Sequence, residues 1–149
     1  MDFSEVFDKV DHEKLIVKLK FYDVNCKIVI WIKNFLYKRT QKVLVNGKES
    51  PSECVLSGVP QGSVLGPLFL VYINDLPKEV SSTIRIFADD SYIYRVIETS
   101  NDNTLLQNDL NKLMEWENKW SMSFHPSKCK LLRITNKRNP NLGDYVIHD

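Results

Sequence analysis

The segment TIRIFADDSYIYRVIE, residues 83–98, constrains the fold more than any other part of the chain. Apolar and polar residues alternate on both sides of Ala88 and Asp89, which is the pattern of two half-buried β-strands. Two strands joined by so short a loop form an antiparallel hairpin. Neighbouring carboxylates repel each other, and Asp disfavours strands. The segment therefore predicts a hairpin with two acids at its tip, which are either solvated turn residues or ligands of a group that offsets their charge.

The composition is that of a globular domain. The chain has 149 residues, of which 43% are apolar and 26% are charged, and this allows one domain with a sizeable core. The formal net charge is +1, which neither indicates nor excludes a nucleic-acid partner, because net charge averages over all faces. Basic residues nevertheless cluster around positions 38–42 and 128–138.

Cysteine usage and hydropathy indicate the compartment. The three cysteines form no CxxC pair, so the sequence predicts neither a disulfide framework nor a zinc site. A reducing compartment is the simpler interpretation. No apolar run is long enough to cross a bilayer, and the charged start of the chain is unlike a signal peptide. We expect a cytoplasmic or nuclear protein with no membrane association.

Helical periodicity predicts two helices in the first part of the chain. Asp11 is expected to cap the first, in DHEKLIVKLKFY, and Asn25 to cap the second. The residues expected on their buried faces are Leu15, Ile16 and Leu19 in the first helix and Ile28, Trp31, Ile32 and Phe35 in the second.

Two further helices are expected later in the chain. Pro67 is tolerated in a first helical turn, so one helix should run from there to about Leu76. A longer amphipathic helix fits about Thr104 to Trp120. Its buried face should contain Leu106, Leu110, Leu113, Trp116 and Trp120, and the tryptophans are interpreted as core residues rather than as platforms for base stacking.

The remaining strands are shorter. QKVLVNGKES is expected to be a strand ending in an Asn46-Gly47 turn, with ECVLS as its partner. GVPQGSVLGP must be a loop. KCKLLRIT is expected to be a final strand, and residues 136–149 are a polar tail whose structure is poorly determined by the sequence. The order of elements predicts an α+β fold, with helices on one face of a mainly antiparallel sheet.

The paired acids suggest a metal site. Hard divalent cations such as Mg²⁺ prefer carboxylate oxygens and remove the repulsion between them. Two such cations can activate an attacking hydroxyl and stabilise a leaving phosphate oxygen. Asp89 and Asp90 need at least one more carboxylate for this, and spacing alone leaves Asp2, Asp8 and Asp11 as candidates.

Four blocks of the sequence resemble one known family. They are DFSEVFDKVDH, SGVPQGSVLGPLFLVYINDL, FADD and WSMSFHPSKCKLLRI, in the family's order. The chain is similar to the palm of the reverse transcriptase of a non-LTR, jockey-like retrotransposon. The resemblance implies a polymerase palm-like fold, a single partial domain over residues 1–149, and parts of the enzyme, fingers and thumb, that this chain does not contain.

The resemblance implies RNA-directed DNA synthesis by two-metal catalysis. Asp2, Asp89 and Asp90 would bind two Mg²⁺ ions, with Mn²⁺ as an alternative, and phosphoryl transfer would depend mainly on positioning and charge neutralisation. Lys128 would donate a proton to the leaving pyrophosphate. The implied partners are an RNA template, a DNA primer and deoxynucleoside triphosphates.

Further residues are implied as nucleotide or template contacts. Phe7 resembles a steric gate against a ribose 2′-hydroxyl, although it is also placed like a core residue. Gln61, beside Pro60, would contact nucleotide or template through its amide. Gly58 and Gly62 would let the backbone approach a ligand, although a plain turn also explains them.

Two other interpretations remain open. The chain could be a catalytically silent remnant that only binds nucleic acid or a protein, because the fingers and thumb are absent and Val6 replaces the family's usual Ala. It could also belong to an RNA-dependent RNA polymerase, although GVPQG and Phe7 argue against that. His12, His125 and His148 show no ligand spacing and are expected to be structural or exposed.

Overall fold

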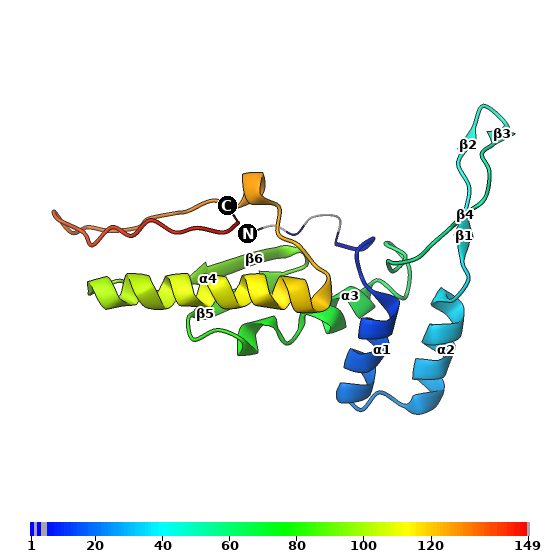
Figure 1. Ribbon diagram of the computed structural model, residues 1–149, viewed down its shortest axis with the longest axis horizontal. Coiled ribbons are helices and arrows are strands. Elements are labelled where there is room, and N and C mark those ends of the chain that lie inside the picture. Colours follow the sequence, from blue (N-terminus) through cyan, green and yellow to red (C-terminus); the bar gives the residue numbers. More distant parts are fainter. Residues whose placement is uncertain (2, 4–5, 149) are drawn as a thin grey trace. The chain divides into compact units, whose positions relative to one another are not determined.

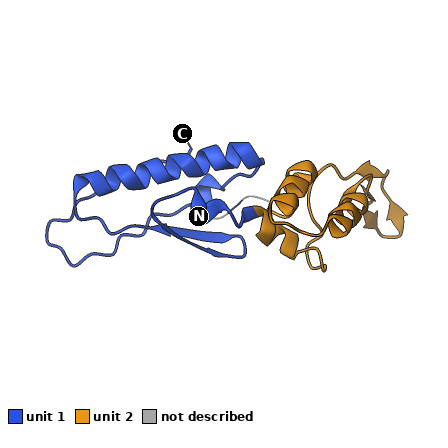
Figure 2. Ribbon diagram, turned by 90° about the horizontal axis from the view of Figure 1, so that it is seen from below, with its two compact units in different colours: residues 1–4, 73–149 blue, residues 5–72 orange. Residues whose placement is uncertain are grey.

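The computed structural model describes residues 1, 3 and 6–148, so positions 2, 4, 5 and 149 lie outside the described residues. The chain divides into two compact units, one made of Met1–Ser4 with Ile73–Asp149 (unit 1) and the other of Glu5–Tyr72 (unit 2) (Figure 2). Helices and small antiparallel sheets occur together, so the predicted α+β class is confirmed. The described strands form three two-stranded sheets rather than one continuous sheet.

Unit 2 begins with the predicted helix pair, α1 (His12–Phe21) and α2 (Cys26–Leu36) (Figure 1). Both caps are as expected, since Asp11 accepts a hydrogen bond from the Lys14 backbone at 2.9 Å and Asn25 from the Lys27 backbone at 2.9 Å. The predicted face of α1 is also confirmed, because Leu15, Ile16 and Leu19 are buried.

The predicted buried face of α2 is wrong in most positions. Val29, Ile32 and Leu36 are buried, whereas Ile28, Trp31 and Phe35 are 52%, 54% and 44% exposed. The sequence CKIVIWIKNFL is apolar on nearly all sides, and periodicity cannot say which of two apolar stripes packs on α1. Trp31 is therefore a surface residue, stacked on Phe35 at 5.6 Å between ring centroids.

A β-ribbon follows α2. The Asn46-Gly47 turn joins β2 (Leu44–Val45) to β3 (Lys48–Glu49), and both turn residues have positive φ, as a tight hairpin turn requires. β4 (Glu53–Cys54), in the expected partner segment ECVLS, pairs with β1 (Thr40–Gln41). The turn prediction is confirmed. The residues directly after the turn, Lys48–Glu49, pair with β2, and the ECVLS segment pairs further back, with β1.

The Gly- and Pro-rich loop leads into α3 (Pro67–Ile73), which starts where expected. The helix ends three residues before the predicted Leu76, and a short 3₁₀ turn, η1 (Leu76–Lys78), follows in unit 1. Pro77 accounts for the early end, because it has no N–H to donate to the carbonyl of Ile73, four residues before it, and its ring would collide with that carbonyl in a continued helix.

Unit 1 contains the predicted hairpin, with β5 (Thr83–Phe87) and β6 (Asp90–Tyr94) in antiparallel register (Figure 1). Ile84 and Ser91 are buried on one face. Their alternation with exposed neighbours reproduces the period of two seen in the sequence.

The long helix α4 (Ser100–Trp120) lies beside the hairpin and starts four residues earlier than predicted (Figures 1 and 2). Thr99 and Asp102 form a capping box that satisfies the first backbone N–H groups, which fixes this start. The expected core positions Leu106, Leu110, Leu113 and Trp116 are buried, whereas Trp120 is only half-buried.

The last part of unit 1 differs from the prediction. KCKLLRIT forms no strand in the described chain, which has a short 3₁₀ turn, η2 (Pro126–Lys128), and then an irregular segment. A strand exists only where a neighbour completes its hydrogen bonds, and the sequence did not supply that neighbour. The tail returns along α4, where Tyr145 donates to Asn103 at 2.6 Å and Val146 donates to Gln107 at 2.9 Å. Among the described residues, no helix is both long and apolar enough to span a membrane.

Candidate active site

The hairpin tip presents the two paired acids. Ala88 and Asp89 form the loop, and Asp90 is the first residue of β6, opposite Phe87. Ala88 has a φ of 53°, a left-handed value that a non-glycine residue adopts at a cost. Asp89 is half-buried and Asp90 is exposed. Within the described part of the chain, neither carboxylate has a hydrogen bond or an ion pair, so both oxygen sets are available to a ligand.

Met1 and Phe3 each contact the later part of unit 1. Met1 donates from its amino group to the Ser91 carbonyl at 2.7 Å, and the Ser91 N–H donates to the Met1 carbonyl at 2.9 Å. Phe3 forms an isolated β-bridge with Phe124, and their rings stack at 4.4 Å. Asp2, the first expected metal ligand, lies outside the described residues, so its expected separation of about 4 to 7 Å from Asp89 stays a prediction.

The other acids considered as ligands have structural surroundings of their own. Asp11 caps α1 with its carboxylate. Asp8 is exposed, and its backbone carbonyl accepts a hydrogen bond from Ser57 at 2.6 Å. The described residues contain no group of three or more His, Cys, Asp or Glu side chains that could hold a metal. The donor set of Asp89 and Asp90 suits a hard divalent cation in kind, but a two-metal site also requires the predicted third carboxylate.

The predicted nucleotide-binding residues belong to unit 2. Phe7 is half-buried and packs on Phe69 with 5.1 Å between ring centroids. The Gly58 N–H donates to the Val10 carbonyl at 2.8 Å, and the Val59 N–H donates to the Phe7 carbonyl at 2.7 Å. These bonds fix the loop to the segment that follows Asp2 in the sequence.

The loop glycines differ in what requires them. Gly58 is buried with a φ of 94°, and a Cβ there would lie 2.9 Å from backbone atoms of Phe7 and Asp8, so packing alone requires glycine. Gly62 has a φ of 72° but open space around it. Pro60 is half-buried and Gln61 is exposed, which leaves the Gln61 amide accessible.

Lys128 and two of the three histidines complete the set of residues considered from the sequence. Lys128 is exposed and ends η2 in unit 1, where its backbone N–H donates to the His125 carbonyl at 3.0 Å. The expected structural role of two histidines is supported by their contacts. His12 shares a 2.8 Å hydrogen bond with the Gly58 carbonyl, and His148 lies 2.9 Å from Glu117.

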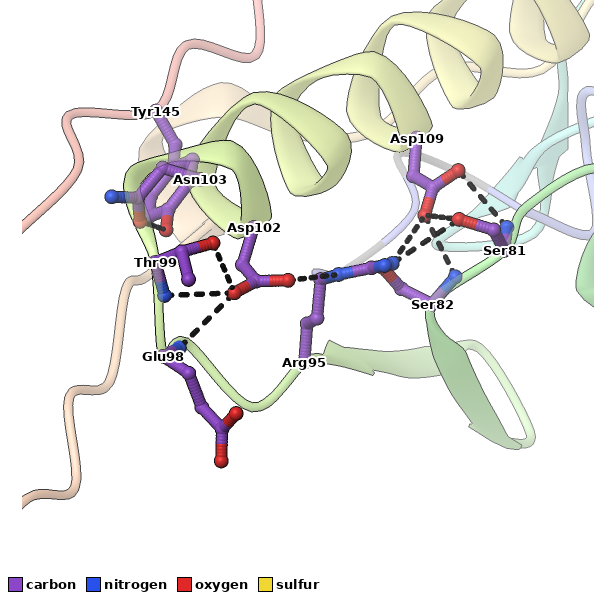
Figure 3. A network of polar contacts seen from close by, with 9 residues as sticks. All are labelled: Ser81, Ser82, Arg95, Glu98, Thr99, Asp102, Asn103, Asp109 and Tyr145. Carbon is purple, nitrogen blue, oxygen red and sulfur yellow. Dashed lines mark hydrogen bonds and ion pairs between the residues drawn. The ribbon is translucent and has the colours of Figure 1, made fainter. Parts of the chain in front are cut away.

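A polar network at the base of the hairpin was not predicted from the sequence (Figure 3). Ser81 and Ser82 precede β5, and Arg95 follows β6; Asp102 and Asp109 come from α4. We call these five residues the hairpin-base cluster. A signal existed in the sequence, since Asp109 lies three residues after Leu106 and four before Leu113, on the apolar face of the helix.

Asp109 is the centre of this cluster. It is 1% exposed and accepts hydrogen bonds from the backbone N–H groups of Ser81 at 2.9 Å and Ser82 at 2.7 Å, and from the Ser81 hydroxyl at 3.0 Å. Burial raises the pKa of Asp109, but the hydrogen bonds from Ser81 and Ser82 outweigh it and lower the pKa from 3.8 to about 2. Asp109 is therefore a buried carboxylate that is held charged.

A cavity of about 370 Å³ lies elsewhere, within unit 2. Its described lining includes Asp11, Lys33, Arg39 and Cys54, but none of the residues predicted as catalytic or nucleotide-binding. This cavity therefore does not identify the site, and the candidate functional residues are those of the hairpin tip and of the loop around Gln61.

Comparison with known proteins gives the family. The family described as "Reverse transcriptase (RNA-dependent DNA polymerase)" matches residues 1–143. The RNA-directed DNA polymerase from mobile element jockey of Drosophila melanogaster is 31% identical over 147 residues, which cover 92% of this chain and 16% of that protein. The probable RNA-directed DNA polymerase from transposon X-element of the same fly is 33% identical, over 98% of this chain and 17% of that protein.

This chain thus spans about a sixth of the length of these curated relatives. The relatives are polymerases of mobile elements, which agrees with the resemblance in the four sequence blocks. The match extends over nearly every residue, from the start of the chain through the paired acids at the hairpin tip to the tail that follows η2. The chain belongs to the reverse transcriptase family.

Proposed function

We propose that this chain is the catalytic palm segment of an RNA-directed DNA polymerase of a non-LTR retrotransposon, acting in the cytoplasm or nucleus. The reaction would add deoxynucleotides to the 3′-hydroxyl of a DNA primer on an RNA template. One observation supports this most strongly. Asp89 and Asp90, whose carboxylates have no hydrogen bond or ion pair with any residue that the structure describes, stand at the tip of a short hairpin in a member of the reverse transcriptase family.

The carboxylates Asp89, Asp90 and Asp2 would hold two divalent cations, Mg²⁺ in the proposal and Mn²⁺ as a substitute. Bound there, the cations would supply activation of the primer hydroxyl and neutralisation of charge on the phosphates. The contacts of Met1 with Ser91 and of Phe3 with Phe124 support the inclusion of Asp2, which stands between Met1 and Phe3 in the sequence.

The other residues would bind and orient the substrates. Phe7 would exclude a ribose 2′-hydroxyl by its bulk, and the exposed Gln61 amide would contact nucleotide or template. Gly58, Pro60 and Gly62 would shape the loop that presents Gln61. Lys128, exposed at the end of η2, would protonate the leaving pyrophosphate from its ammonium group.

The test places residues 1–143 in the Drosophila melanogaster jockey polymerase, in place of its matching segment. The rest of that polymerase then supplies the fingers and thumb. We expect Mg²⁺-dependent incorporation of deoxynucleotides on an RNA template, and its loss in Asp89→Asn, because an amide oxygen binds cations more weakly than a carboxylate does. Glu79→Gln, an equivalent change at an exposed position of unit 1, is the matched control and should retain activity.

Undiminished incorporation by Asp89→Asn would defeat the proposal. A hybrid that folds but incorporates nothing, while the parent polymerase is active, would favour the alternative that this chain is a silent remnant. Comparing ribonucleotide with deoxynucleotide incorporation in the same hybrid tests the role of Phe7.

A further inference from the structure

Among the described residues the proposed metal-binding hairpin is a two-stranded sheet, to which Met1 adds two backbone hydrogen bonds at Ser91. A two-stranded sheet has little stability of its own. Five residues of each strand separate its base from its tip. At about 3.4 Å per residue the tip lies roughly 17 Å from the base, so a tilt of about 5° at the base moves the tip by about 1.5 Å. A catalytic group tolerates a displacement of only about 0.5 Å, so the base of this hairpin must be held firmly.

The hairpin-base cluster holds both ends of the hairpin against one helix (Figure 3). On the entering side, two successive backbone N–H groups, of Ser81 and Ser82, donate to Asp109. On the leaving side, Arg95 donates to the hydroxyls of Ser81 and Ser82 at 3.1 Å each. Arg95 also lies 3.8 Å from an oxygen of Asp109, so the two strand ends and α4 form one connected network.

The network continues to the start of α4. The Nε atom of Arg95 is 3.8 Å from Asp102, the residue that closes the helix capping box with Thr99. Asp102 and Asp109 are seven residues apart, about two helical turns, so they project from the same side of α4. Arg95 therefore lies between two carboxylates of a single rigid element.

We propose that Asp109 is a positioning residue for the tip carboxylates, acting through the backbone of Ser81 and Ser82 to fix the direction of the hairpin. This inference rests on the proposed function, because it assumes that Asp89 and Asp90 bind a divalent cation. Asp109 does not touch the cation or the substrates. Its contribution is the geometry with which the tip presents its oxygens.

Asp109→Asn is the informative substitution. It preserves the size of the side chain but replaces an accepting oxygen with an NH₂ group, which would face a donor of Ser81 or Ser82. A buried donor would then lose its partner, and the hairpin base would shift or loosen. Because the site lies at the far end of the hairpin, such a shift should reach Asp89 and Asp90 while the rest of the fold is retained.

The experiment measures Mn²⁺ binding by this 149-residue chain through water-proton relaxation, at a temperature where every variant is folded. Asp89→Asn reports the tip site, and Asp109→Asn should weaken Mn²⁺ binding about tenfold, as loss of a supporting residue does at metal sites. Leu113→Ala, one turn further along α4 and outside the cluster, is the control for lost stability. It should bind Mn²⁺ as the wild type does.

The outcomes separate the two proposals. If Asp109→Asn binds Mn²⁺ as tightly as the wild type does while Asp89→Asn binds it more weakly, the positioning role is overturned and the metal site stands. Equal weakening by Asp109→Asn and Leu113→Ala would also overturn it, because stability alone would then explain the effect. Binding that does not depend on Asp89 would overturn both proposals. If Asp109→Asn does not fold, Arg95→Gln replaces it, since Arg95 is partly exposed and the same weakening is expected.

Discussion

Acid should weaken this fold through Asp109 in a defined pH range. The pKa of Asp109 is lowered from 3.8 to about 2, so folding favours its charged form. Its stabilisation is complete above the unfolded pKa and is lost as the pH falls through that value towards the folded one. A shift from 3.8 to about 2 corresponds to about 2 kcal/mol, of which roughly half should be lost by pH 3.

The assay is urea unfolding followed by tryptophan fluorescence, between pH 6 and pH 2, of the wild type and of Asp109→Asn. Trp116 is buried in the same unit, so its emission should report the transition. The side-chain amide that replaces the carboxylate in Asp109→Asn does not titrate in this pH range. The advantage of the wild type over the variant should therefore shrink by about 2 kcal/mol across this range.

A control removes a carboxylate that folding does not bury. Asp144 is fully exposed and lies 3.6 Å from Arg133, and a surface pair of this kind contributes less than about 1 kcal/mol. Asp144→Asn should follow the wild type at every pH. If the difference between the wild type and Asp109→Asn stays constant from pH 6 to pH 2, the hydrogen bonds of Ser81 and Ser82 do not hold Asp109 charged and the reasoning is wrong.

Five further substitutions test the fold by the same unfolding measurement. Gly58→Ala should lower the free energy of unfolding by about 3 kcal/mol or more, because the φ of Gly58 is 94° and a Cβ there would meet backbone atoms at 2.9 Å. Gly62→Ala, in open space, should lower it by about 1 kcal/mol. Equal losses for the two variants would contradict the packing around Gly58. Trp116→Ala should lower the free energy of unfolding by about 4 kcal/mol and Trp31→Ala by less than about 1 kcal/mol. The reverse order would indicate that Trp31 lies on the buried face of α2, as the periodicity of the sequence predicted. Ala88→Gly should stabilise the hairpin by about 0.5 kcal/mol, and a loss would show that the left-handed φ of 53° is not strained.

Features fixed by short-range chemistry were predictable from the sequence. The Asp11 and Asn25 caps depend on a side chain and a backbone group a few residues apart. The Asn46-Gly47 turn follows from the residues that tolerate positive φ. The hairpin with Asp89 in its loop follows from alternation alone, so the main element of the candidate site could be located without a structure.

Features that depend on distant partners were not predictable in the same way. The apolar surface of α2 offered two faces, and only packing against α1 selected Val29, Ile32 and Leu36. The expected strand KCKLLRIT had no identified neighbour. The place of Asp109 on the apolar face of α4 was visible in the sequence, but its donors lie 27 and 28 residues away and could not be identified. The roles of Asp2, Phe7, Gln61 and Lys128 came from the family resemblance rather than from physical reasoning.

The backbone hydrogen bond from Ser91 to the Met1 carbonyl has a practical corollary for spectroscopy. An amide hydrogen held in such a bond exchanges with solvent only when the bond opens. Ser91 follows Asp90 directly in the sequence, so the exchange rate of its amide would report how firmly the segment around Met1 is held beside the paired acids.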